Sequence, residues 1–333
     1  MKLTVLGSGG WGTALALLLL ENGHDVTLWS YLDSESAVLR EKRENPVLPG
    51  VPLPDALKLT ADMSCVRGCR AVVLATPSFA VRTTARQLKG MLDPGTVLIS
   101  VSKGVEKETS FTLTQVIEDE AKGFPVVALS GPSHAEEVGR HVPTVVVAAS
   151  KDKEAAHLTQ DLFMNPRFRV YTTDDVVGVE LGAALKNVIA LAAGVLDGLG
   201  CGDNTKAALM TRGLAEIARL GKAMGGRTAT FAGLAGVGDL IVTCTSMHSR
   251  NRRCGILIGQ GVPPAQAVKQ IGMVVEGYYA AVNAKALADK MGVEMPITSA
   301  AYAVLYEGKD PWETVTELMT RDRKSETEES WVS

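Results

Sequence analysis

Two ionisable side chains lie in stretches of sequence that are otherwise apolar. Lys186 belongs to LGAALKNVIALAAGVLDGLG (residues 181–200), which is apolar on nearly every side of a helix, and Asp239 belongs to GLAGVGDLIVTCTS (residues 233–246). A buried lysine either reaches solvent with its ammonium or has a partner, and an ionised carboxylate in an apolar setting needs a counter-charge. Pairing Lys186 with Asp239 would satisfy both groups. The alternative for Asp239 is a helix cap that follows Gly238.

A basic run and three short loops predict an anionic small-molecule substrate. The run SRNRR (residues 249–253) can offer hydroxyl, guanidinium, amide and backbone N–H donors to one phosphate dianion where it opens a helix. Lys103 lies in SKG (102–104), between the loops ATPS (75–78) and SGPSHA (130–135). Ligands of open α/β sheets bind outside the carboxyl ends of the strands, so these loops predict the floor of a site. The alternative is that these basic residues are solvated surface charges.

The first residues, MKLTVLGSGGWGTALALLLL, combine an apolar strand pattern with the spacing G-x-G-x-x-G. In this interpretation Gly7 allows a tight turn, Gly9 lets a pyrophosphate approach the backbone, and Gly12 lets the next helix pack on the strand. The free N–H groups at the start of that helix favour an anion. A secretory leader is the alternative, but the glycines interrupt its apolar run and no A-x-A pattern follows. We therefore expect a dinucleotide cofactor, NAD or NADP.

The end of the second strand does not separate the two dinucleotides. This position often holds an acidic residue for the ribose hydroxyls of NAD, or a basic residue for the 2′-phosphate of NADP. Here Trp29 is followed by Ser30 and Tyr31, Asp33 lies beyond the usual position, and no Arg or Lys comes before Arg40. The sequence therefore predicts either NAD or NADP as the cofactor.

Strand and helix patterns alternate in the first half of the chain, and only helix patterns follow. The expected strands are 2–6, 26–29, 71–75, 96–101, 126–130, 144–150 and 168–171, with helices between them at 78–91, 107–122 and 153–164. In the second half the clearest helices are 179–199, 205–224, 252–260, 276–291 and 299–306. The predicted fold class is an α/β Rossmann-type doubly wound sheet, mostly parallel, followed by an all-α C-terminal domain.

The change of pattern also predicts two domains. The chain has 333 residues, more than the size at which a single hydrophobic core usually stops growing. We expect a dinucleotide-binding domain at 1–175 and a helical substrate-binding and catalytic domain at 176–333, with Asp174 and Asp175 capping the first helix of the second. The charged stretch at about 322–333 predicts a frayed tail.

Composition argues against several classes of protein. A formal net charge of −3 does not favour nucleic acid or a membrane surface as the partner. We expect no apolar run to reach the ~20 residues that span a bilayer, and hence no membrane insertion. The five cysteines lack the spacing of a zinc site or a disulfide framework, which predicts no metal and the reduced thiols of a cytoplasmic protein.

Taken together, these segments resemble the bacterial NAD(P)-dependent glycerol-3-phosphate dehydrogenases. The resemblance rests on GSGGWGTALA, SKG, SGPSHAEEV, LGAALKNVIALAAGV, RGLAEIARLG, GLAGVGDLIVTCTS, SRNRR, VVEGYYAA and MPIT, which are distributed over nearly the whole chain. It implies a Rossmann domain, a helical substrate domain, and reversible reduction of dihydroxyacetone phosphate to sn-glycerol 3-phosphate for phospholipid synthesis.

The resemblance also implies roles for individual residues, with Lys186 as the catalytic acid/base and Asp239 beside it. The residues that it assigns to the substrate are Lys103, Gly131, Ser133, Lys186, Asn187, Asp239, Thr243, Ser249, Arg250 and Asn251. Those assigned to the cofactor, besides the glycines at 7, 9 and 12, are Gly10, Trp11, Lys103, Ala135, Arg250, Val274 and Glu276. Ser30 and Tyr31 stand where the family often has Arg or His. His134 replaces the usual aromatic residue, and we expect it to pack there.

Two other functions fit parts of the pattern. A related two-domain hydroxyacid dehydrogenase acts on a carboxylate, whereas SRNRR and the GPS loop favour a phosphate. A non-catalytic dinucleotide sensor needs the glycine motif but not Lys186 and Asp239 in apolar surroundings. By fold-level analogy we also expect a homodimer formed through the helical half.

Overall fold

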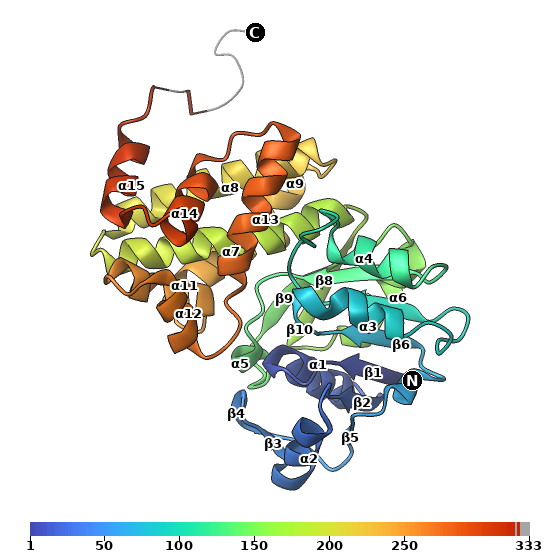
Figure 1. The fold of residues 1–333 in the computed structure, drawn as a ribbon. Coiled ribbons are helices and arrows are strands. Elements are labelled where there is room, and N and C mark those ends of the chain that lie inside the picture. Colours follow the sequence, from blue (N-terminus) through green and yellow to red (C-terminus); the bar gives the residue numbers. More distant parts are fainter. Residues whose placement is uncertain (324, 327–333) are drawn as a thin grey trace.

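The chain folds into a sheet with helices on both sides, followed by a bundle of helices (Figure 1). The computed structural model describes residues 1–323, 325 and 326. Every strand ends by residue 173, and within the described residues only helices follow. The predicted Rossmann-type sheet followed by an all-α part is therefore confirmed.

The main sheet has eight strands in the order β10-β9-β8-β7-β6-β1-β2-β5. Their bounds are β1 Lys2–Leu6, β2 Asp25–Trp29, β5 Lys58–Thr60, β6 Ala71–Leu74, β7 Val97–Ser100, β8 Val126–Ser130, β9 Thr144–Ala149 and β10 Phe168–Thr173. All neighbours are parallel except β8 and β9, where Ala128 lies opposite Ala149 in an antiparallel pair. The chain winds in opposite directions on the two sides of β1, and ligands of doubly wound sheets bind at such a point.

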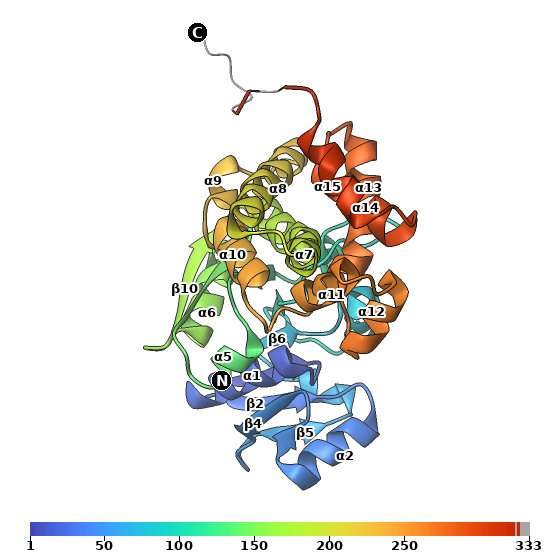
Figure 2. The ribbon, with the colours of Figure 1, turned by 90° about the vertical axis from the view of Figure 1, so that its left-hand side faces the viewer.

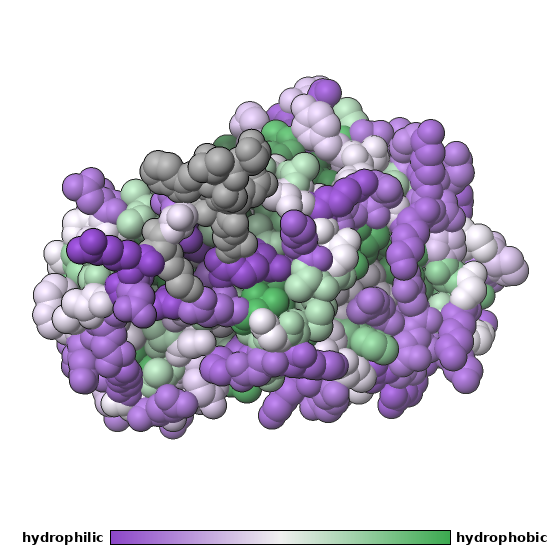
Figure 3. All heavy atoms as spheres, turned by 90° about the horizontal axis from the view of Figure 1, so that it is seen from above, coloured by the Kyte–Doolittle hydropathy of each residue, from purple (hydrophilic) through white to green (hydrophobic). Residues whose placement is uncertain are grey.

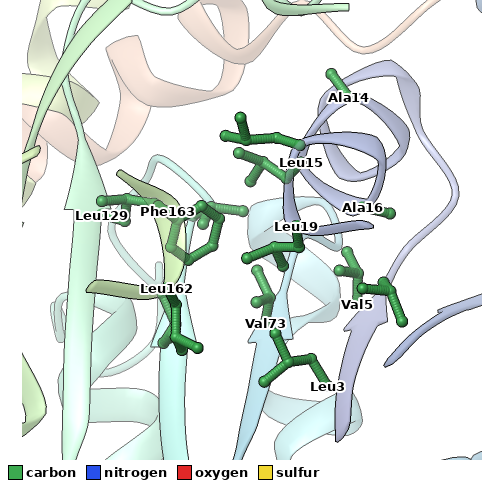
Figure 4. Packing of buried hydrophobic residues seen from close by; sticks show 14 of the residues in the cluster. Leu3, Val5, Ala14, Leu15, Ala16, Leu19, Val73, Leu129, Leu162 and Phe163 are labelled. Atoms are coloured by element: carbon green, nitrogen blue, oxygen red, sulfur yellow. The ribbon is translucent and has the colours of Figure 1, made fainter. Parts of the chain in front are cut away.

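Helices cover both faces of the sheet. On one face lie α1 (Gly10–Glu21) and α6 (Lys153–Phe163), whose Leu15 and Phe163 pack with Val5 of β1 (Figure 4). On the other lie α3 (Val81–Gln87) and α4 (Leu113–Glu120), in a second apolar cluster with Leu74. Strands that are buried on both faces need continuous apolar runs, which is why these strands are visible in the sequence.

Several predictions for the sheet domain are wrong in detail. The helix expected at 107–122 begins only at Leu113, because a capping box of Thr112 and Gln115 starts it there. The helix expected at 78–91 is a 3-10 turn, Ser78–Ala80, followed by α3. The elements that were not predicted are α2 (Asp33–Lys42), α5 (Ala135–Val138), the 3-10 turn Met63–Val66, the edge strand β5, and the small antiparallel pair β3 (Glu44–Asn45) and β4 (Leu48–Pro52).

In the second half, the other helices surround the long, mostly buried α7 (Val176–Gly198) (Figure 2). They are α8 (Asp203–Ala223), α9 (Thr228–Phe231), a π-helical turn (Leu234–Gly238), α10 (Asp239–Thr245), α11 (Arg250–Gly259), α12 (Pro264–Ile271), α13 (Glu276–Met291), α14 (Pro296–Tyr306) and α15 (Pro311–Met319). The five expected helices are present. At the start of α7, Asp175 accepts the Gly178 N–H at 2.9 Å and caps the helix as predicted. Asp174 does not cap it and pairs with Arg227 instead.

Glycines allow α11 to cross α7 with the two backbones in contact. A Cβ on Gly194 of α7 would overlap the backbone of Arg252, and a Cβ on Gly255 of α11 would overlap the carbonyl oxygen of Leu191. Only glycine permits so close an approach. The crossing therefore fixes the start of α11 near the middle of α7.

Two further glycines bring the segments before α10 and after the start of α13 against α7. A Cβ on Gly182 would lie 2.6 Å from the Ala235 carbonyl oxygen, in the turn that precedes α10. A Cβ on Gly277 would overlap the carbonyl oxygen of Asn187. As a result, the segments at the starts of α10, α11 and α13 all contact α7 between Gly182 and Gly194.

The apolar character of α7 is that of a core helix. Contrary to the sequence expectation, α7 and the run Thr228–Thr245 are long and apolar enough to span a bilayer by length and composition. Inside the protein, however, 89% of the apolar window of α7 is buried. Seen from above, the helical end is mainly hydrophilic, with small hydrophobic patches (Figure 3). Most of the predicted tail lies outside the described residues.

Candidate active site

The turn from β1 into α1 has the shape that a pyrophosphate requires. Gly7 has a φ of +115°, and a Cβ on Gly12 would overlap the Gly7 carbonyl oxygen, so both positions need glycine. Around the position of a Cβ on Gly9 nothing lies within 4 Å, which leaves the backbone open to a ligand. The first turn of α1 holds no acidic residue, and its free N–H groups favour an anion. The residues present therefore fit the dinucleotide.

Other residues predicted to line the cofactor lie around this turn. Ser30 and Tyr31 directly follow β2, which is hydrogen-bonded to the turn. Ser30 is buried, whereas Tyr31 is 73% exposed. Ala135 starts α5, and its Cβ lies 3.6 Å from the position of a Cβ on Gly10. Trp11 is partly buried and packs against the apolar cluster that the sheet forms with α1 and α6.

Lys186 and Asp239 form a buried ion pair, as the sequence predicts. Lys186 is 5% exposed and Asp239 is 1% exposed. The Lys186 Nζ donates to Asp239 Oδ1 and, at 2.5 Å, to Thr243 Oγ1. The Lys103 Nζ donates to Asp239 Oδ2 at 2.7 Å and to the Gly131 carbonyl at 3.2 Å. The Asp239 carboxylate of the helical half therefore binds two amines, and one of them, Lys103, comes from the edge of the sheet. The alternative role of Asp239 as a helix cap is wrong, because its side chain does not cap α10.

Burial and the charges of this cluster shift the pKa values of Lys186 and Asp239. Burial lowers the pKa of Lys186 to about 7; the Asp239 carboxylate opposes this and the Lys103 charge adds to it. Burial acts to raise the pKa of Asp239, but the charges and hydrogen bonds of the two lysines outweigh it, so the pKa lies below its ordinary value. Lys186 is thus an amine that can change protonation state near neutral pH.

A chain of amide hydrogen bonds lies next to the lysine. The Asn251 Nδ2 donates to Asn187 Oδ1 at 3.0 Å, and the Gly277 N–H donates to Asn251 Oδ1 at 2.8 Å. Both asparagines are buried. The structure therefore brings these two predicted substrate residues together beside Lys186, at the point where α11 and α13 begin.

The basic run combines residues that have structural partners with two, Arg250 and Arg253, whose guanidinium groups have none among the described residues. Ser249 is the N-cap of α11 and accepts the Arg252 N–H at 3.2 Å. The Arg252 Nε in turn donates to Asp197 at 2.7 Å. Among the described residues, none forms a hydrogen bond or ion pair with the Arg250 guanidinium. Burial lowers the pKa of Arg250, and the charge of Glu276 is the main effect that opposes this shift. A largely desolvated guanidinium without an ion-pair partner is suited to bind an anion.

The predicted cofactor residues at the start of α13 lie across from the sheet edge. Glu276 is the first residue of α13, and its Oε2 accepts the Ser78 hydroxyl at 3.0 Å. Burial raises the pKa of Glu276, while the hydrogen bond from Ser78 opposes the shift. Val274 stands two residues before it. The hydrogen bond between Ser78 and Glu276 joins the loop after β6 to the helical half.

The loop after β8 holds the remaining predicted residues. Gly131 has a φ of +144°, and the Ser133 hydroxyl donates to the Gly131 carbonyl at 2.9 Å. His134 is the N-cap residue of α5, and its ring centroid lies 5.8 Å from that of His248. Burial, followed by the nearby Lys186 charge, lowers the pKa of His134 and favours a neutral ring.

Sequence reasoning missed two contributors to the site. Ser78 was included only in a loop, without its bond to Glu276, and Asn45, which donates to the Ser8 carbonyl at 2.8 Å, carried no signal. A hollow of about 530 Å³ between α13, α14 and α15 contains none of the predicted residues and is separate from this site. Among the described residues, no group of three His, Cys, Asp or Glu side chains could hold a metal ion.

A Rossmann-type dinucleotide turn faces a buried lysine carried by a helical domain, and this combination defines a two-domain NAD(P)-dependent dehydrogenase. The family descriptions "NAD-dependent glycerol-3-phosphate dehydrogenase N-terminus" and "C-terminus" match residues 2–156 and 175–316. The chain belongs to this family.

Individual relatives agree over almost the full length. The chain is 52% identical to a glycerol-3-phosphate dehydrogenase (NAD(P)+) of Desulfitobacterium hafniense, over 98% of this chain and 94% of the relative. It is 55% identical to the one of Moorella thermoacetica, over 98% of each. The crystal structure of glycerol-3-phosphate dehydrogenase from Coxiella burnetii matches with a TM-score of 0.93 and 40% identity, over 96% of this chain and 98% of that one.

The lowered pKa of Lys186 predicts opposite pH dependences for the two directions of reaction. With Lys186 in the acid/base role that we propose below, reduction uses the ammonium and its kcat/KM should fall as the pH rises through about 7, whereas oxidation uses the neutral amine and should become faster over the same interval. The measurement is kcat/KM in each direction against pH, above the pH at which a substrate phosphate titrates. Profiles that change only near 10, where a free lysine titrates, would contradict the prediction.

Proposed function

We propose that the chain catalyses the reversible reduction of dihydroxyacetone phosphate to sn-glycerol 3-phosphate, which supplies glycerophospholipid synthesis. The observation that carries this proposal is the buried Lys186–Asp239 pair, joined through Lys103 to the sheet edge that ends in the glycine turn. When bound, NADH or NADPH supplies the hydride. The residues of the chain supply the proton, the orientation and the anchor for the phosphate.

In this proposal Lys186 acts as the acid/base. Its ammonium gives a proton to the carbonyl oxygen as negative charge develops there, and in the oxidative direction the neutral amine takes the proton from the hydroxyl. Asp239 Oδ1 and Thr243 Oγ1 receive two of its hydrogen bonds, and its third acceptor, the Asp239 carbonyl at 3.5 Å, is distant enough for a substrate oxygen to replace it. Because the pair is almost fully buried, its interaction with the reacting oxygen is stronger than it would be in water.

The phosphate is held at the start of α11 in the same proposal. The Arg250 guanidinium and the free backbone N–H groups of the first turn are the principal donors. The remaining substrate contacts come from Lys103, Gly131, Ser133, Asn187, Ser249 and Asn251. Binding energy from the phosphate positions the carbonyl, at the other end of the molecule, against Lys186.

The cofactor lies across the glycine turn in this proposal. The residues that hold it are Gly7, Gly9, Gly10, Trp11, Gly12, Ser30, Tyr31, Lys103, Ala135, Arg250, Val274 and Glu276. The open backbone at Gly9 and the closeness of Gly10 and Ala135 support this arrangement. The chain accepts NAD or NADP.

We further propose the division into a dinucleotide domain at 1–175 and a catalytic domain at 176–333. The two-residue connection between β10 and α7 supports this boundary. A homodimer is proposed because symmetric dimers are the commonest assembly of soluble enzymes. A cytoplasmic location is supported by five cysteines that are all free thiols.

The proposal predicts NADH or NADPH oxidation with dihydroxyacetone phosphate, and loss of phosphate recognition in Arg250→Ala. Removal of a charge-assisted contact worth about 3 kcal/mol should raise KM for this substrate by about 100-fold. The unphosphorylated ketone dihydroxyacetone is the control, since at saturating cofactor its slow reduction should be unaffected by the variant. Cofactor oxidation is followed by absorbance.

Other outcomes would point to the other functions. Faster turnover of a 2-keto acid would identify a hydroxyacid dehydrogenase, and NADH binding without oxidation by any of these ketones would identify a sensor. An Arg250→Ala enzyme that kept its preference for the phosphorylated ketone would remove Arg250 from the anchor.

A further inference from the structure

A small hairpin lies against the glycine-rich turn, although the two are far apart in sequence. It consists of β3 and β4 and spans residues 44–52, in the proline-containing stretch ENPVLPGVP. Most of its side chains are exposed, but Asn45 is only 3% exposed. A buried carboxamide needs hydrogen-bond partners, and here those partners belong to the cofactor turn.

The NH₂ group of the Asn45 side chain connects the hairpin with this turn. Its Nδ2 donates to the Ser8 carbonyl at 2.8 Å and to Thr13 Oγ1 at 2.6 Å. Its Oδ1 accepts the N–H of Val47 at 3.1 Å, which holds the amide group in this orientation. Ser8 lies between the first two glycines of the motif, and Thr13 is in the first turn of α1.

The bond to Ser8 determines where the next N–H points. In a planar trans peptide the C=O and the following N–H point in opposite directions. With the Ser8 carbonyl held towards Asn45, the N–H of Gly9 is directed away from the hairpin. Gly9 is the position with open space around it, where a pyrophosphate can approach. Asn45 therefore selects the peptide orientation that presents this donor.

The rest of the hairpin restrains the same turn. The Val47 carbonyl oxygen would lie 3.1 Å from a Cβ on Gly10, so the hairpin backbone reaches the start of α1. Leu48 and Val51 approach Gly139, just after α5, to within 3.2 Å of a Cβ position there. The hairpin thus connects the glycine turn with the helix that carries Ala135.

We propose that Asn45 is a positioning residue for the dinucleotide cofactor. It does not touch the reacting atoms; it holds the Ser8–Gly9 peptide so that the pyrophosphate meets an N–H group. This inference depends on the proposed binding of the cofactor at the glycine turn, but it does not depend on the identity of the substrate.

The test is NADH affinity, measured by quenching of tryptophan fluorescence with the full-length protein. Asn45→Asp keeps the shape of the side chain but replaces the NH₂ donor with an oxygen that repels the Ser8 carbonyl. We expect the Kd for NADH to rise at least about tenfold, with kcat at saturating NADH within about twofold of wild type and an unchanged KM for the ketone. Thr13→Val, which removes one Asn45 partner at nearly constant volume, should raise the Kd by a smaller factor.

The matched control is Glu44→Gln in the same hairpin. The Glu44 Oε1 accepts the Gly50 N–H at 2.9 Å, a contact that does not involve the glycine turn, so its weakening should leave the Kd unchanged. Thermal unfolding identifies the variants that fold. An unchanged Kd in a folded Asn45→Asp or Thr13→Val protein overturns the inference, as does an equal loss in Glu44→Gln. Absence of NADH binding by the wild type would instead overturn the cofactor site itself.

Discussion

Substitution of Lys186 by methionine is expected to lower kcat about 10²- to 10⁴-fold in both directions, the range in which general acid/base groups contribute. Methionine fills the space of the lysine stem without an ionisable group. Asp239 keeps its ion pair with Lys103 through Oδ2, so the variant should fold. The measurement is single-turnover oxidation of bound NADH together with the Kd for NADH, which should stay near that of wild type.

Lys186→Arg separates charge from proton transfer. A guanidinium stays protonated at any accessible pH, so the variant cannot act as a base in the oxidative direction.

Turnover of Lys186→Met within about tenfold of wild type would remove the amine from the mechanism. Loss of NADH binding in the same variant would indicate a structural role instead.

Substitution of Asp239 by asparagine is expected to be the most destabilising of these changes. It leaves two amines, one of them almost fully buried, without their shared counter-charge. Breaking a buried pair in this way costs about 3–5 kcal/mol in the free energy of unfolding. Urea-induced unfolding at pH 7 measures the loss. Reduction should also slow, because the pKa of Lys186 falls further when the carboxylate is removed and less ammonium is present.

The cost of Asp239→Asn should depend on pH. In the variant the native amine is neutral while the unfolded lysine, with its ordinary pKa near 10.4, binds a proton. The unfolded state then holds more protons, so the stability of the variant rises with pH towards that value. The wild-type amine keeps its proton only below about pH 7, so the deficit relative to wild type should be larger at pH 6 than at pH 8 and nearly constant above pH 8. Asp174→Asn, at an exposed carboxylate paired with Arg227, is the control. A deficit that is the same for both variants would contradict this account.

The central pair could be predicted from sequence because its signal is local. Lys186 and Asp239 stand out as charges among apolar residues, and burying either one alone is costly. The strands of the parallel sheet have the same advantage, since burial on both faces makes each a continuous apolar run. That Lys103 shares Asp239 was not predicted, because the contact joins residues from the two halves of the chain and leaves no pattern in either.

The hairpin at 44–52 shows why other parts could not be predicted. Its prolines and glycine disrupt the alternation by which strands are recognised, and its stability comes from contacts with the glycine turn and α5. Asn45 looks like an ordinary loop residue in the sequence.

The reversed direction of β9 determines where α7, the helix that carries Lys186, begins. Because β9 and β10 run against β8, β10 ends at the sheet edge opposite the glycine turn, two residues before α7 begins. From there α7 travels back beside the sheet, at about 1.5 Å per residue, before it reaches Lys186. Within α7, Glu180 accepts the Thr114 N–H at 2.9 Å, and this hydrogen bond fixes the helix to the sheet domain. The lysine is therefore carried by a helix that is itself hydrogen-bonded to the sheet domain, which fixes the distance between the amine and the sheet.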